Sequence, residues 1–222
     1  MWYDVADRLA PDRFTMDLMD VRGCGRSDRP SRGHDLEGYA SDVRSVLGEI
    51  GGPVTVVAHS MGAKIVQFLA CDASNAIERL ILVAPGVAAA VRPSPRHRAQ
   101  TLESFGSRRA IERFTRAAMF RAPTERSFER LVDDALLAQY EHWIGWYDRG
   151  RAADFADRLG EIRVPTLAIA GEKDPLVSAA RVKRDLTNKI EGALLVTLRG
   201  AGHNLPVETP AEIAAAIERF TA

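Results

Sequence analysis

Five short apolar runs constrain the fold of this chain more than any other feature. They cover residues 14–18, 54–57, 80–83, 166–170 and 194–198. As a group they lack the apolar-polar alternation of a strand with one solvated face, which is typical of strands buried on both faces in a parallel sheet covered by helices.

Helical patterns separate these runs. They span residues 2–9, 36–50, 61–71, 179–186 and 211–220. Strands and helices that alternate along a chain indicate an α/β fold with a mostly parallel sheet. The sequence therefore predicts an α/β core flanked by helices.

One long interval interrupts this alternation, between the run that ends at residue 83 and the one that begins near residue 165. It contains amphipathic patterns at residues 108–120, 127–138 and 140–148, entered through the stiff segment 92–96. We expect a helical insertion at residues 87–155 over a core formed by residues 1–86 and 156–222. Its excess of arginine is typical of a solvated helix surface, with contacts to an anionic substrate as the alternative.

Charge and cysteine content exclude several classes of protein. Lys and Arg together number 30, as do Asp and Glu, so no overall field favours nucleic acid or an anionic membrane. Two isolated cysteines, Cys24 and Cys71, form neither a disulfide framework nor a metal site. With no signal-peptide pattern at the start and no apolar run of membrane-spanning length, we expect a cytoplasmic protein. The expected partner is a small molecule; the oligomeric state is left open.

Ser60 lies between an apolar run and a helical pattern, in the segment Ala58-His59-Ser60-Met61-Gly62. Small residues two before and two after a serine allow a sharp strand-to-helix turn that exposes its hydroxyl. The pentapeptide alone is equally compatible with a helix N-cap. The rest of the chain must decide, because a serine hydroxyl is inert without a base and a group that orients the base.

A base and an acid follow two later apolar runs. His203 comes after residues 194–198 and is preceded by Gly200 and Gly202, whereas Asp174 follows residues 166–170. Catalytic groups in open α/β sheets gather at the carboxyl ends of the strands, so we expect Ser60, Asp174 and His203 to meet there. Glu172 is a weaker candidate for the acid, and we expect His59 to point to the other side of the turn.

A glycine-rich stretch at residues 20–28 is the alternative candidate for a binding site. Asp28 occupies the position of the third glycine in a dinucleotide-binding pattern, so we interpret the stretch as a structural turn in which Cys24 is a packing residue. The sequence implies neither a metal nor an organic cofactor.

Four segments together resemble the α/β-hydrolase fold family, in its serine hydrolase branch with a helical cap. They are residues 20–28, residues 58–62, residues 164–174 and the pair Gly202-His203, in the family's order. The resemblance implies that Ser60 is the nucleophile, His203 the base and Asp174 its orienting acid, and that Met61 supplies an oxyanion-hole N–H. It also implies hydrolysis of an ester or related acyl compound through an acyl-enzyme intermediate.

The resemblance further implies a buried strand before Met1 that ends in a His-Gly loop. The backbone of this loop provides the second oxyanion donor, and the strand lies in the sheet between residues 14–18 and 54–57. We expect the protein to begin upstream; the alternatives are that residues 14–18 pair directly with 54–57, or that another chain fills the gap. The competing functional hypothesis is an impaired hydrolase-fold protein that acts as a binding module or has no activity of its own.

Overall fold

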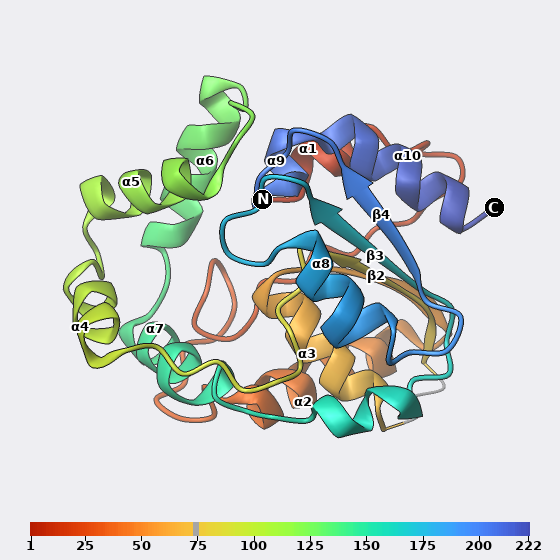
Figure 1. The fold of residues 1–222 in the computed structure, drawn as a ribbon, viewed down its shortest axis with the longest axis horizontal. Helices are drawn as coiled ribbons and strands as arrows, with labels where there is room; N and C mark the ends of the chain where they lie inside the picture. The colour runs from red at the N-terminus through yellow and green to blue at the C-terminus, as the bar shows by residue number, and fades with distance from the viewer. Residues whose placement is uncertain (73–75) are drawn as a thin grey trace.

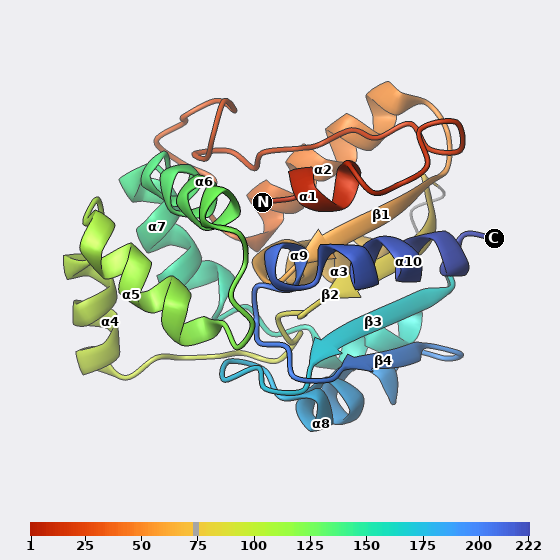
Figure 2. The ribbon, with the colours of Figure 1, turned by 90° about the horizontal axis from the view of Figure 1, so that it is seen from above.

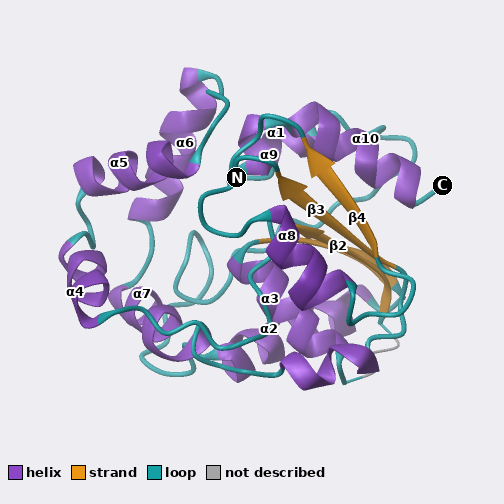
Figure 3. Ribbon diagram, viewed as in Figure 1, coloured by secondary structure: helices purple, strands orange, loops and turns teal. Residues whose placement is uncertain are grey.

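The computed structural model describes residues 1–72 and 76–222 and contains one parallel sheet of four strands. The strands are β1 (Val54–His59), β2 (Ile77–Val83), β3 (Thr166–Gly171) and β4 (Leu194–Leu198), and they pair in chain order. Helices cover both faces of this sheet (Figures 1 and 3). The predicted α/β fold with a mostly parallel sheet is confirmed.

Alternate residues of the strands feed two hydrophobic cores, one on each face of the sheet. Leu80 and Leu82 pack against α2 (Leu36–Ile50) and α3 (Met61–Ala70). Ile81 and Val83 face the opposite core, which α1 (Tyr3–Ala6) and α10 (Pro210–Phe220) complete. Burial on both faces explains why the central strands are continuously apolar in sequence.

Helix α2 begins and ends at the predicted residues, because both of its ends carry strong signals. The Asp35 side chain accepts a hydrogen bond from the Gly38 N–H at 3.0 Å, and Gly51 ends the helix in the left-handed conformation, with φ of 76°. The predicted helix at 179–186 is instead an α-helical turn, α8 (Ala179–Val182), continued by a π-helical turn at Lys183–Thr187.

Residues 14–18 do not form the predicted strand. The segment crosses the surface without a partner in the sheet, and Met16 and Leu18 are exposed. A strand needs a neighbour for its backbone N–H and C=O groups, and no described strand pairs with this segment. The alternative in which it pairs directly with β1 is therefore wrong. Within the described part of the chain, β1 pairs only with β2.

Four α-helices stand between β2 and β3 in the sequence and gather beyond the carboxyl ends of the strands (Figure 2). They are α4 (Pro95–Glu103), α5 (Arg108–Ala118), α6 (Glu125–Leu136) and α7 (Tyr140–Gly145), the last continued by a π-helical turn at Trp146–Gly150. Helix α4 begins inside the segment that the sequence indicated as a stiff hinge, with Ser94 as its cap. We refer to these helices, with their connections, as the helical insertion.

Lys64 joins the two segments that connect the helical insertion to the core. Its side chain is buried, and the ammonium donates to the carbonyl oxygens of Ala89, Arg151 and Ala153 at 3.3, 3.1 and 2.7 Å. Burial lowers the pKa of Lys64 to about 8. One side chain from α3 thus links the entry and the exit of the insertion.

Candidate active site

Ser60 occupies a strained turn between β1 and α3. Its φ of 48° lies in the left-handed region, which costs a non-glycine residue about 1 to 3 kcal/mol. Three backbone hydrogen bonds hold the turn: Ser60 N–H donates to the Val83 carbonyl at 3.0 Å, and its own carbonyl accepts from Lys64 and Gly86 at 3.2 and 3.0 Å. The Ser60 side chain makes no capping hydrogen bond, which argues against the helix N-cap interpretation.

The structure brings Ser60, His203 and Asp174 together from the ends of three strands. Ser60 Oγ lies 2.9 Å from His203 Nε2, and His203 Nδ1 lies 2.8 Å from Asp174 Oδ2. Because an ionised carboxylate can only accept, Nδ1 carries the ring proton and its N–H donates a hydrogen bond to Asp174. Nε2 is then left with a lone pair directed at the serine hydroxyl, which is the arrangement that a general base requires.

The acid is fully buried and its second oxygen is also occupied. The Asp174 side chain is 0 % exposed, and Oδ1 accepts from the N–H groups of Leu176 and Val177 at 2.7 and 3.0 Å. These two donors fix the plane of the carboxylate so that Oδ2 faces His203. Glu172, the weaker candidate, is exposed and accepts instead from the Gly200 N–H at 2.8 Å.

His59 lies closer to the site than the sequence indicated. We expected its ring to point away, but its Nε2–H donates to the His203 carbonyl at 2.8 Å, and the two rings are 5.1 Å apart. An imidazole N–H that is largely withdrawn from solvent needs an acceptor, and the His203 carbonyl supplies it. Burial, and secondarily the neighbouring His203, lower the pKa of His59 to about 3, so it stays neutral at physiological pH.

Met61 is the first residue of α3 and follows Ser60 directly. The first N–H groups of an α-helix have no acceptor within the helix, and the helix dipole makes this end partially positive. The Met61 N–H is therefore placed where it can donate to a negative charge that develops beside Ser60.

The other candidate regions of the sequence show no comparable chemistry. The glycine-rich stretch forms a turn in which Gly23 N–H donates to the Asp28 carbonyl at 2.8 Å. Burial raises the pKa of the Cys24 thiol to about 12, the opposite of what a nucleophilic thiol requires. Across residues 1–72 and 76–222, no group of three His, Cys, Asp or Glu side chains is arranged to hold a metal ion.

Two further histidines are buried in a polar cluster away from these groups. His34 and His142 both contact the hydroxyl of Tyr39, at 3.4 and 2.8 Å. Burial lowers the pKa of His142 to about 4, with His34 as the second cause. The cluster links α2 to α7 and fits a structural role.

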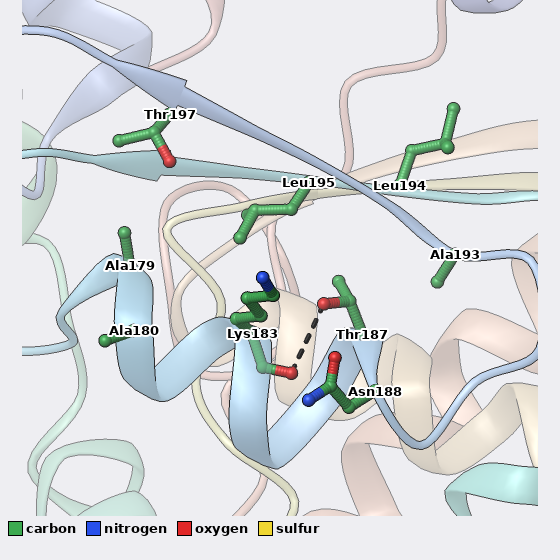
Figure 4. A pocket seen from close by; sticks show the side chains of 9 residues that line it. All are labelled: Ala179, Ala180, Lys183, Thr187, Asn188, Ala193, Leu194, Leu195 and Thr197. Atoms are coloured by element: carbon green, nitrogen blue, oxygen red, sulfur yellow. Dashed lines mark hydrogen bonds between the residues drawn. The ribbon is translucent and has the colours of Figure 1, made fainter.

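A hollow of about 550 Å³ lies between β4 and the helical segment that follows β3 (Figure 4). Its lining includes Lys183, Thr187 and Thr197 and none of the three residues that meet at Ser60. The hollow is therefore separate from the candidate active site.

No helix in the described ranges is both long enough and apolar enough to cross a membrane.

A sheet edge that carries a strained serine, hydrogen-bonded through a histidine to a buried aspartate, defines the class of site. The chain belongs to the alpha/beta hydrolase family, whose model matches residues 1–216. Among curated proteins, it is 26 % identical over 203 residues to a non-heme chloroperoxidase of Streptomyces lividans, covering 84 % of this chain and 74 % of that protein. It is 25 % identical over 236 residues to a 2-(acetamidomethylene)succinate hydrolase of Mesorhizobium japonicum, covering 94 % and 79 %.

Solved structures share the fold. An esterase from Exiguobacterium antarcticum superposes with a TM-score of 0.83 at 20 % identity, over 91 % of this chain and 80 % of that one. An N-formylmaleamic acid deformylase from Pseudomonas putida superposes with a TM-score of 0.79 at 22 % identity, over 97 % and 85 %.

Proposed function

We propose that the protein is a serine hydrolase of carboxylic esters or related acyl compounds. The observation that carries the proposal is the continuous hydrogen-bonded series from Ser60 Oγ through His203 to the buried Asp174. The likeness to proteins named as an esterase and a succinate-derivative hydrolase supports it.

In the first half of the reaction, Ser60 Oγ attacks the acyl carbon while its proton passes to His203 Nε2. Asp174 holds the imidazole by its Nδ1–H and stabilises the imidazolium that forms. The Met61 N–H donates to the oxyanion of the tetrahedral intermediate. The bond to the leaving group then breaks, and His203 returns the proton to that group, leaving the acyl group on Ser60.

In the second half, water takes the place of the leaving group. His203 Nε2 accepts a proton from the water as its oxygen attacks the acyl carbon, and the same proton returns to Ser60 Oγ as the carboxylic acid departs. The helical insertion stands over the carboxyl ends of the strands and shapes the space for the acyl and leaving groups. Because several relatives are named chloroperoxidases or haloperoxidases, hydrogen peroxide is an alternative acceptor of the acyl group, which would then leave as a peracid.

A fluorophosphonate probe tests the proposal, because it reacts much faster with a serine whose proton is removed by a neighbouring base than with an ordinary serine. We expect one adduct per chain, mapped to Ser60, and loss of the adduct in Ser60→Ala. The exposed Ser45 provides the matched control, since Ser45→Ala removes a hydroxyl of the same kind outside the site. A folded wild-type chain that remains unlabelled would support the competing hypothesis of a noncatalytic binding module.

A further inference from the structure

Glu208 makes an unusual set of contacts next to the candidate active site. The residue is buried in α9 (Leu205–Glu208), five positions after His203, and its carboxylate accepts four backbone N–H groups. Oε2 accepts from Gly202, Phe120 and Arg121 at 2.8, 2.9 and 3.0 Å, and Oε1 accepts from Asn204 at 2.9 Å.

These four donors belong to two parts of the molecule that are far apart in sequence. Gly202 and Asn204 flank His203 on its loop, whereas Phe120 and Arg121 follow α5 in the helical insertion. A buried carboxylate with several N–H donors forms charge-assisted hydrogen bonds, which are about twice as strong as neutral ones. Glu208 therefore joins the histidine loop to the insertion through charge-assisted hydrogen bonds.

Further contacts join the loop that carries His203 to the helical insertion. The N–H of His203 itself donates to the Ala118 carbonyl at 2.8 Å, so the insertion also holds the backbone of the histidine directly. A side chain at Gly202 would place its Cβ 2.7 Å from the Ala118 oxygen and 2.7 Å from the Phe120 nitrogen, so the two segments approach as closely as their backbones allow. The guanidinium of Arg121 donates to the carbonyls of Gly200 and Arg199 at 3.1 and 2.6 Å.

We propose that Glu208 is a positioning residue for His203, an inference that rests on the function proposed above. Its hydrogen bonds couple the position of the helical insertion to the position of the imidazole ring. A substrate that shifts the insertion as it binds also shifts residues 202–204, and with them the 2.9 Å contact between His203 Nε2 and Ser60 Oγ. Proton transfer depends steeply on such a distance, since a misplacement of about 1 Å can cost a hundredfold in rate. The insertion thus controls the alignment of the base in addition to shaping the pocket.

The variant Glu208→Gln tests the coupling with little change in shape. Glutamine has one acceptor oxygen, which stays toward the three donors at Oε2, and its NH₂ group then faces the Asn204 N–H. We expect the rate at which a fluorophosphonate labels Ser60 to fall about tenfold. Glu212→Gln is the matched control: Glu212 is a nearby exposed acid that pairs with the Arg121 guanidinium, and its loss should leave the rate within twofold.

Amide hydrogen exchange supplies a readout that a merely structural role would not move. In the wild type, phosphonylation of Ser60 should change the exchange rates of the Phe120 and Arg121 amides together with those of Gly202 and Asn204. In Glu208→Gln, phosphonylation should change the exchange rates of Gly202 and Asn204 without the accompanying change at Phe120 and Arg121. The proposal is overturned if folded Glu208→Gln labels as fast as the wild type. If that variant does not fold, an unchanged exchange at Phe120 and Arg121 in the phosphonylated wild type overturns it equally.

Failure of the proposed function gives a different result. A wild-type chain that no fluorophosphonate labels contradicts the hydrolase mechanism. Exchange in the unmodified protein still reports whether Glu208→Gln loosens the amides of Asn204 and Phe120 together, and if it does not, the coupling is absent.

Discussion

Asp174→Asn should lower kcat/KM for ester hydrolysis about ten-thousandfold while leaving the fold intact. The orientation of the substituted side chain is set by the backbone N–H groups of Leu176 and Val177, which donate to Oδ1 of Asp174 at 2.7 and 3.0 Å. These donors will hold the amide oxygen of an asparagine at the Oδ1 position and direct its NH₂ group toward His203.

The consequence is a change of tautomer at His203. With an NH₂ group opposite, Nδ1 must accept a hydrogen bond, so the ring proton moves to Nε2, which faces Ser60 Oγ at 2.9 Å. A protonated Nε2 cannot take the serine proton. An equivalent Asp-to-Asn change in a serine protease triad lowers kcat by about 10⁴, which corresponds to about 5.5 kcal/mol.

The assay is hydrolysis of p-nitrophenyl acetate, with thermal melting to verify folding. Glu172→Gln is the matched control, because Glu172 lies in the same turn, is exposed, and accepts from the Gly200 N–H at the surface. We expect that control to stay within a few fold of the wild type. If folded Asp174→Asn retains more than a tenth of the wild-type kcat/KM, the assignment of Asp174 as the orienting acid is wrong.

Two further predictions concern stability. Ser60→Gly should unfold at higher urea than Ser60→Ala, with a free energy of unfolding about 1 kcal/mol greater, because only glycine adopts the φ of 48° without strain; equal midpoints would show that the turn is unstrained. The pKa of Lys64 is lowered to about 8 from 10.5 by burial, so between these pH values the unfolded state binds more protons than the folded one. The free energy of unfolding should therefore rise by about 3 kcal/mol from pH 7 to pH 10.5, relative to Lys64→Met, which does not titrate. A difference between the two proteins that is constant across this range in urea titrations would contradict the assignment.

The four strands of the sheet and the meeting of Ser60, Asp174 and His203 were predictable because their sequence signals are local. A strand buried on both faces is apolar throughout, and a candidate catalytic side chain follows within a few residues of three strand ends, as with Ser60, Asp174 and His203. Chain order and the geometry of a parallel sheet then bring the three ends to one edge.

Features that depend on contacts between distant segments were not predictable in this way. Residues 14–18 have the composition of a strand, but a strand also requires a partner, which the run itself does not reveal. Glu208 lies two residues after Pro206 and precedes Thr209-Pro210, so in the sequence it resembles an exposed acid at a helix start. Two of its four donors lie almost ninety residues away along the chain, at Phe120 and Arg121. His59 was likewise missed, because its acceptor is the carbonyl of His203.

Pre-steady-state hydrolysis of p-nitrophenyl acetate tests most directly whether Ser60 forms an acyl-enzyme intermediate. We expect a burst of one p-nitrophenol per chain, one acetyl group on the peptide that contains Ser60 after an acid quench, and no burst in Ser60→Ala. A folded chain that shows no burst and no acetylated Ser60, or that carries the acetyl group on another residue, would contradict the account.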